Sequence, residues 1–209
     1  MAPVVIVALG DSTTAGTPLF ESPIEAPPNG RGDERSQYAY WLMTRHPDWR
    51  VLNRGVNGER SDQIAARFDR DVVSARPAAV VIVAGVNDIY QGKPAAAVTA
   101  QLGAMFDRAA AEKIPVVAGS ILPYNTATGP QNDAMHAVNA WIAARAAQDP
   151  HVRFVDTRAA VAAAGQIDRL SGSPDGLHPD IDAYHRMADA IEPVLRDLLG
   201  RTELAPAHP

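Results

Sequence analysis

Residues 79–84 read Ala-Val-Val-Ile-Val-Ala and contain no polar side chain. A strand of this composition presents apolar side chains on both faces of its sheet, so other parts of the chain must cover both faces. Helices packed on each side of a parallel sheet provide such cover. This run therefore favours an α/β fold in which the sheet lies between two layers of helices.

Short apolar runs alternate along the chain with segments of helical period, which is typical of repeated βα units. We predict five strands, at residues 4–9, 50–52, 79–84, 114–118 and 152–155. Other segments repeat apolar residues every three or four positions, as the buried face of a helix does. These residues are Ile64, Phe68 and Val72; Val98, Leu102, Met105 and Ala109; Met135, Val138 and Ile142; and Tyr184, Met187, Ile191, Val194 and Leu198. Helix N-caps are predicted at Ser36, Ser61 and Asp182.

No linker divides the chain, and its 209 residues, 46% of them hydrophobic, can bury a sizeable core. We predict one domain over residues 1–200 and a flexible tail over residues 201–209. Residues 17–35 hold four prolines and no apolar period, so they are predicted to form a long loop. Loops of this length tend to be functional or mobile, and the sequence does not decide whether this one is a lid.

The charge balance and the absence of cysteine exclude several functions. Nineteen Lys and Arg against 24 Asp and Glu give a formal net charge of −5, which offers no basic surface to a nucleic acid. Without cysteine the chain has no disulfide, thiolate metal ligand or cysteine nucleophile. The apolar stretch at residues 3–9 is too short to span a membrane and lacks a basic leader. We expect a monomer or small homo-oligomer that is cytoplasmic, or secreted or periplasmic if a signal peptide was removed.

Polar segments follow three of the predicted strands. Residues 10–16 follow the first strand, residues 53–59 the second and residues 85–88 the third, while residues 175–179 precede the last helix. In a doubly wound sheet the ligand crevice lies outside the carboxyl ends of the strands. We therefore expect the functional site where these segments meet.

The chemistry in these segments suits acyl transfer. A serine hydroxyl becomes a useful nucleophile when a base takes its proton and a third group orients that base. Ser12, His178 and Asp175 can fill these roles, because Asp175 lies three residues before His178 in a glycine-containing turn. The backbone N–H groups of Ser12 and Gly58 and the amide of Asn87 can stabilise an oxyanion. Gly58 is predicted to be glycine because a close backbone approach leaves no room for a Cβ atom.

Four segments resemble the blocks of the SGNH hydrolase family, also called the GDSL lipases and esterases. They are Gly10-Asp11-Ser12-Thr13, Gly58, Gly85-Val86-Asn87-Asp88 and Asp175-Gly176-Leu177-His178, in that order. The resemblance spans nearly the whole chain. It implies a flavodoxin-like three-layer α/β/α sandwich with a five-stranded parallel sheet. It also implies esterase activity, with Ser12 as nucleophile, Gly58 and Asn87 in the oxyanion hole, and Asp175 and His178 completing the triad.

Two positions depart from the family's commonest pattern. Thr13 stands where Leu is commonest, and this variant is also typical of family members that deacetylate carbohydrates. Arg60 stands where Thr is often found, so the pocket wall beyond the oxyanion hole can differ. The acids Asp11 and Asp88 are predicted to fix the site loops through hydrogen bonds to the backbone.

The leading prediction is a serine esterase that needs no cofactor or metal and acts on small-molecule esters, with short-chain acyl or aryl esters first. Acyl thioesterase or lysophospholipase activity and carbohydrate deacetylation are alternatives on the same triad, because a fold does not select the substrate. A metallophosphoesterase is a more distant alternative, since no early Asp-x-His pair is present. A catalytically dead binding module is disfavoured because no triad position is substituted.

Substrate contacts are predicted for five side chains: Phe20, Ile89, Tyr90, Tyr124 and Leu177. The loop at residues 17–35 leaves the strand that leads to Ser12, so we expect it to shape the acyl or leaving-group pocket. Its acidic residues, Glu21, Glu25, Asp33 and Glu34, are expected to disfavour anionic substrates such as acyl-CoA. Replacement of residues 18–33 by a short linker is expected to leave acetate-ester turnover largely intact, because the catalytic groups lie elsewhere in the sequence.

Overall fold

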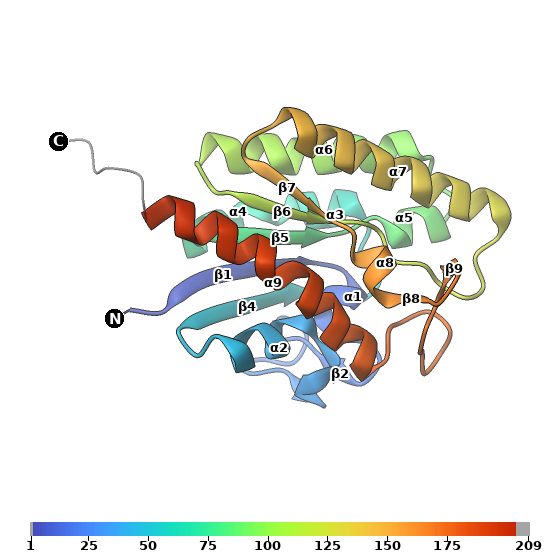
Figure 1. Cartoon of the computed structure of the whole chain (residues 1–209), viewed down its shortest axis with the longest axis horizontal. Helices are drawn as coiled ribbons and strands as arrows, with labels where there is room; N and C mark the ends of the chain where they lie inside the picture. The colour runs from blue at the N-terminus through green and yellow to red at the C-terminus, as the bar shows by residue number, and fades with distance from the viewer. Residues whose placement is uncertain (1, 204–209) are drawn as a thin grey trace.

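The centre of the fold is a five-stranded parallel sheet with the strand order β4-β1-β5-β6-β7 (Figure 1). In the computed structural model the backbone is described over residues 2–203 and the side chains over residues 2–200. The strands are β1 (Val4–Gly10), β4 (Trp49–Gly55), β5 (Ala79–Val83), β6 (Val116–Gly119) and β7 (Val152–Val155). All five predicted strands are confirmed. β4 is longer than predicted because Asn53 and Arg54 continue the pairing with β1, although they interrupt its apolar run.

Helices cover both faces of this sheet, as the composition of β5 requires. Val80 and Ile82 face one apolar cluster, and Val81 and Val83 face the other. Figure 1 shows α6 and α7 on one side of the sheet and α2 on the other. The fold is therefore the predicted three-layer α/β/α sandwich. Its main helices are α2 (Tyr38–Arg45), α3 (Ser61–Ala66), α4 (Phe68–Asp71), α6 (Ala95–Ala111), α7 (Gly129–Gln148) and α9 (Ile181–Glu203).

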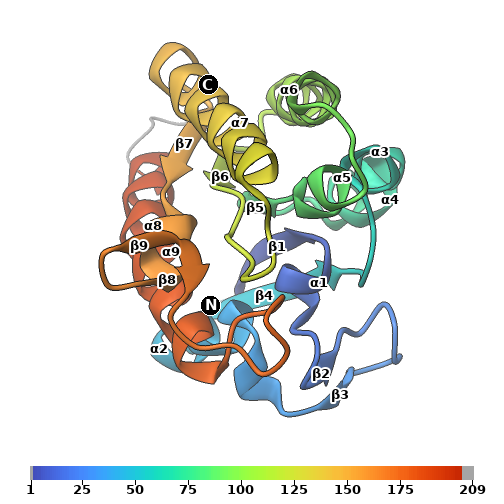
Figure 2. The ribbon, with the colours of Figure 1, turned by 90° about the vertical axis from the view of Figure 1, so that its right-hand side faces the viewer.

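Short elements surround the carboxyl ends of the strands (Figure 2). The predicted loop at residues 17–35 contains a two-stranded antiparallel ribbon, and a 3₁₀ turn begins at its end. A second small ribbon follows α8. These elements are α1 (Ser12–Ala15), β2 (Phe20–Glu21), β3 (Arg31–Gly32), η1 (Glu34–Ser36), η2 (Val73–Ala75), α5 (Val86–Tyr90), α8 (Thr157–Val161), β8 (Ala162–Ala163) and β9 (Gln166–Leu170).

Three predicted N-caps are wrong because tertiary partners use the side chains or the helix begins elsewhere. Ser36 ends a 3₁₀ turn and donates its hydroxyl to the Gly16 carbonyl, at 2.9 Å. Ser61 is the first residue of α3, and its hydroxyl donates to Asp88 at 2.8 Å. Asp182 lies inside α9. The Asp180 carboxylate instead accepts the N–H of Ala183, at 2.8 Å.

Two further boundaries differ from the sequence prediction. The apolar stripe at residues 64–72 spans two short helices, α3 and α4, which are separated at Arg67. α9 continues to Glu203, three residues into the predicted tail, and the remaining tail residues, 204–209, lie outside the described residues. Within residues 2–203, no helix is long and apolar enough to cross a membrane.

Candidate active site

The four polar segments meet at the carboxyl ends of the parallel strands, the edge that Figure 2 turns toward the reader. Ser12 opens α1 directly after β1, and Gly58 lies in the connection from β4 to α3. Asn87 lies in α5, directly after β5, and His178 lies in the turn before α9. The crossover connections of a parallel sheet bring these sequence-distant residues to one edge.

Asp175 and His178 form the hydrogen-bonded pair that the sequence predicts. The distance from His178 Nδ1 to Asp175 Oδ2 is 2.7 Å. Asp175 Oδ1 also accepts the backbone N–H groups of Leu177 and His178, at 2.9 and 2.8 Å. Burial opposes the ionisation of Asp175, but these hydrogen bonds and the charge of His178 outweigh it and lower the pKa of Asp175. The carboxylate therefore stays ionised and orients the ring so that Nε2 is available as a base.

Ser12 is buried, with 3% of its surface exposed, at the first position of α1. In the part of the chain that the structure describes, no hydrogen bond joins Ser12 Oγ to His178. Nucleophile–base contacts are often long without substrate and shorten in the complex. The neighbouring Asp11 is close enough to His178 for the two charges to interact. The structure thus brings the segment of Ser12 and the Asp175–His178 pair together.

Two of the predicted oxyanion donors, Asn87 and Gly58, are linked through the residue that follows Gly58. Asn87 donates one amide hydrogen from Nδ2 to the Glu59 carbonyl, at 2.9 Å, and its second amide hydrogen makes no hydrogen bond with the described residues. Gly58 has a φ of +78°, a conformation that favours glycine. No atom lies within 4 Å of a Cβ built at Gly58. Within the described protein nothing crowds this position, and the positive φ is the reason for glycine that the structure shows.

The two acids predicted to be structural fix the site loops. Asp11 Oδ1 accepts the N–H of Thr13 at 3.0 Å and the Thr13 hydroxyl at 2.8 Å. Asp88 accepts the N–H and the hydroxyl of Ser61, at 2.7 and 2.8 Å. These contacts confirm their predicted role. The Thr13 hydroxyl is consequently occupied inside its own turn and is not directed toward a substrate.

The predicted substrate contacts separate into two groups. Tyr90 is 55% exposed, and its ring lies 5.7 Å from the Tyr124 ring, measured between centroids. Tyr124 itself is buried, with 1% of its surface exposed, and Leu177 packs against the same apolar cluster. Ile89 faces the core and Phe20 lines a separate cavity of about 320 Å³ beside α2 and β4. Both side chains are buried, with 2% of Ile89 and 4% of Phe20 exposed, so neither offers surface to a substrate in this structure.

The match to a known family covers most of the chain. The family model of the GDSL-like lipase/acylhydrolase family matches residues 8–186. The chain belongs to this family. Esterase TesA of Pseudomonas aeruginosa is 30% identical over 154 residues, which cover 73% of this chain and 72% of that protein. The resemblance stated from the four sequence blocks is thereby confirmed, and the family is one of esterases and acylhydrolases.

Solved structures share the fold of this family member. A structure of TesA covers 93% of this chain and 99% of its own, with 25% identity and a TM-score of 0.73. A G-D-S-L family lipolytic protein from Desulfitobacterium hafniense covers 91% and 99%, with 22% identity and a TM-score of 0.74. Axe2, an acetyl-xylooligosaccharide esterase from Geobacillus stearothermophilus, covers 93% of both chains, with 20% identity and a TM-score of 0.72.

Two residues at the site escaped sequence reasoning, Glu59 and Arg67. Glu59 contributes a backbone carbonyl to Asn87, and backbone acceptors leave no trace in residue type. Arg67 lies nine residues after Gly58, inside an apolar stripe that predicts one continuous helix, and only the break in that helix reveals its position. Among the described side chains, no three His, Asp or Glu residues are grouped as metal ligands.

Proposed function

We propose that this family member is a serine esterase that hydrolyses short-chain acyl or aryl esters through an acyl-enzyme. The observation that supports it best is the 2.7 Å hydrogen bond between His178 Nδ1 and Asp175, which lies at the carboxyl ends of the strands, where Ser12 also lies. A base oriented by an ionised carboxylate beside a serine hydroxyl is the arrangement that serine acyl transfer requires.

In the proposed reaction Ser12 Oγ attacks the ester carbonyl carbon while His178 Nε2 takes the hydroxyl proton. The negative charge that develops on the carbonyl oxygen is stabilised by the N–H groups of Ser12 and Gly58 and by the Asn87 amide. The imidazolium, stabilised by Asp175, then gives its proton to the leaving alkoxide. Water hydrolyses the acyl-enzyme by the same steps, with His178 again as base.

The short neutral ester remains the preferred substrate, but the loop acids no longer support that choice. Glu21 pairs with Arg31 and Asp33 pairs with Arg35, each at 2.7 Å. Glu25 accepts two backbone N–H groups. Because these carboxylates are occupied, they repel an anionic substrate less than their number suggests. The exposed ring of Tyr90, which packs edge-on against the buried Tyr124, is the feature that favours an acyl or aryl group of limited size.

Ser12→Ala tests the proposed nucleophile. We expect the variant to lose ester hydrolysis and keep its melting temperature, because the hydroxyl supplies the bond-forming atom and makes no hydrogen bond with the described residues. An organophosphonate should label Ser12 and no other serine. Label at Ser120 or Ser173 would contradict the assignment, since their hydroxyls already donate to Asp156 and to the His178 carbonyl.

A series of p-nitrophenyl esters, run beside acetylated sugars and acyl-CoA, tests the substrate class. Each buried methylene contributes about 0.8 kcal/mol, so kcat/KM should rise nearly fourfold per carbon until the pocket ends at about four to six acyl carbons. Tyr90→Ala should flatten this profile, while Ile167→Ala, at another exposed apolar residue, should not. A preference for acyl chains of about twelve carbons or more, or for acyl-CoA, would contradict the short-ester proposal.

A further inference from the structure

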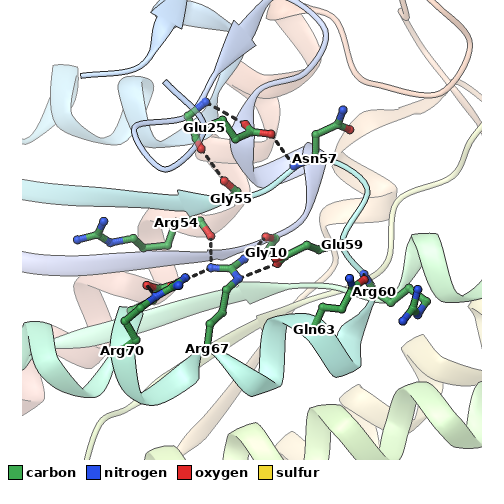
Figure 3. Close-up of polar contacts among 12 residues, drawn as sticks. Gly10, Glu25, Arg54, Gly55, Asn57, Glu59, Arg60, Gln63, Arg67 and Arg70 are labelled. Carbon is green, nitrogen blue, oxygen red and sulfur yellow. Dashed lines mark hydrogen bonds and ion pairs between the residues drawn. The ribbon is translucent and has the colours of Figure 1, made fainter. Parts of the chain in front are cut away.

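Arg67 is a buried arginine between α3 and α4, with 6% of its surface exposed. Figure 3 shows its guanidinium at the centre of a network of charged groups and backbone carbonyls. Nε donates to Glu59 at 2.6 Å, and Nη1 donates to Asp71 at 2.6 Å. Nη1 and Nη2 also donate to the carbonyls of Arg54 and Gly10, at 2.8 and 2.9 Å. Four acceptors thus hold one planar group in a single orientation.

These acceptors lie beside the proposed oxyanion donors. Gly10 precedes Ser12 by two residues, so the first contact fixes the end of β1 from which the nucleophile emerges. Arg54 and Glu59 stand on either side of Gly58. The Glu59 carbonyl in turn accepts the Asn87 amide, at 2.9 Å. A single guanidinium therefore links the three chain segments that carry all three donors.

The opposite side of the Gly58 segment is fixed by the loop at residues 17–35. Glu25 accepts the N–H of Asn57 at 2.8 Å, and the Ser22 hydroxyl donates to the Gly55 carbonyl at 2.6 Å. Figure 3 shows Glu25 reaching Asn57 on the side of the strands away from Arg67. Gly58 lies between these attachments, and its own N–H makes no hydrogen bond with the residues that the structure describes. That N–H is therefore held in place yet available to a substrate oxygen.

We propose that Arg67, acting through the Glu59 carboxylate, is a positioning residue of the oxyanion hole. This inference rests on the proposed esterase function and concerns the same site. An oxyanion hole is effective because its donors need no reorganisation when the charge develops. A segment with a glycine at positive φ has few steric restraints of its own, so the restraint must come from its neighbours. The Arg67–Glu59 ion pair supplies that restraint beside Gly58.

Four variants separate positioning from general charge effects. Glu59→Ala removes the partner of Arg67 and keeps the backbone carbonyl that Asn87 uses. Glu59→Gln restores a hydrogen-bond acceptor, and Arg67→Lys keeps the charge without the planar fork. Arg70→Gln is the control for charge, because Arg70 is exposed, donates its hydrogen bonds to Asp71, and acts on Glu59 through its charge without a hydrogen bond.

We expect Glu59→Ala and Arg67→Lys to lower kcat for p-nitrophenyl acetate by about tenfold to a hundredfold, as small misplacements of catalytic groups do. KM should change much less, because the contacts that weaken belong to the transition state. A boronic acid forms a bond to Ser12 Oγ, and the adduct resembles the tetrahedral intermediate. The affinity for this inhibitor should fall together with kcat. The pH–rate profile should keep its shape, since Asp175 and His178 are untouched. Glu59→Gln should recover most of kcat.

Hydrogen exchange of the amides at residues 55–59 is measured on the same proteins. Faster exchange in Glu59→Ala and Arg67→Lys, but not in Arg70→Gln, is expected if the ion pair restrains this segment. Unchanged kcat and boronate affinity in Glu59→Ala with an active wild type would overturn the positioning role alone. A fall that Arg70→Gln shares would also overturn it. A wild type inactive on every ester would instead overturn the proposed function, and with it any catalytic role for Arg67.

Discussion

The carboxyl group of Asp11 is predicted to make the stability of the protein depend on pH. Asp11 is fully buried, and its Oδ1 accepts two hydrogen bonds from Thr13. Its Oδ2 is also buried but has no hydrogen-bond partner among the described residues. Charge on an unpaired buried oxygen is costly, so burial raises the pKa of Asp11 to about 6, against the hydrogen bonds from Thr13 and the charge of His178.

The size and sign of the effect follow from this value. The difference between the ordinary pKa of 3.8 and a pKa of about 6 corresponds to about 3 kcal/mol. Between these two values the folded protein keeps a proton that the unfolded chain has released. The contribution of Asp11 is therefore fully present below about pH 4, and the free energy of unfolding falls as the pH rises through about 6. In Asp11→Asn this ionisation is absent.

The assay is urea unfolding of wild type and Asp11→Asn between about pH 4 and pH 7. We expect the stability of Asp11→Asn relative to wild type to increase by about 2 to 3 kcal/mol over this range. We compare the change in stability with pH and not the absolute stability. The substitution places an NH₂ group where Oδ2 lacks a hydrogen-bond partner, and this alters the stability at every pH. Asp62→Asn is the control, since the hydrogen bond from Arg60 lowers the pKa of Asp62, so that this group ionises below the assayed range and the difference from wild type should stay flat. A flat difference for Asp11→Asn would refute the reasoning.

Three further variants test the site. Asn87→Ala should lower kcat by about 10² to 10³ with a smaller change in KM, as loss of an oxyanion donor does, and an unchanged kcat would make Asn87 a structural residue. Asp175→Asn should lower kcat by about 10⁴, because the carboxylate no longer holds His178 in the tautomer that can act as base. If steady-state kinetics gave this variant the kcat of wild type, Asp175 would not belong to the triad. Replacement of residues 18–33 by a Gly-Ser linker should slow even acetate-ester turnover, because it removes Glu25 and Ser22 from the Gly58 segment. Unchanged acetate turnover would show that these two contacts do not matter for catalysis.

The layers and strands of the fold could be predicted because burial on both faces leaves a strong pattern. β5 has only apolar side chains, and its alternate residues face the two clusters that the helices complete. Element ends were harder to predict. The N-cap expected at Ser61 is wrong because the hydroxyl bonds to Asp88, twenty-seven residues away along the chain. A choice between local and distant partners cannot be made from a local pattern.

In the candidate site, too, local contacts could be predicted from the sequence and distant ones could not. Asp175 and His178 are three residues apart, so their contact is local and the sequence could predict it. Phe20 and Ile89 were assigned to the substrate pocket because each lies near a site segment in the sequence. Both side chains are buried, since nearness along the chain does not decide whether a side chain faces solvent or the core. Phe20 packs under its own loop and Ile89 faces the core.

The contacts of the loop at residues 17–35 argue against the expected independence of loop and catalytic groups. The loop leaves the chain after α1, but Ser22 and Glu25 return to the backbone at Gly55 and Asn57. These contacts attach the loop directly to the segment that carries Gly58. Under the proposed function, a change of the loop therefore acts on the position of a proposed oxyanion donor.

The hydrogen bonds of Arg67 depend on the pairing of two strands. Two of its acceptors are the carbonyls of Gly10 and Arg54, which lie at the carboxyl ends of adjacent strands. These carbonyls come together when β1 and β4 pair in the register that sets Gly10 beside Gly55. The guanidinium can then leave water, because its hydrogen bonds and two carboxylates are in place to offset the cost of burial. The proposed oxyanion donors thus depend, in our proposal, on an interaction that forms only in the completed sheet, and the sequence blocks alone do not contain it.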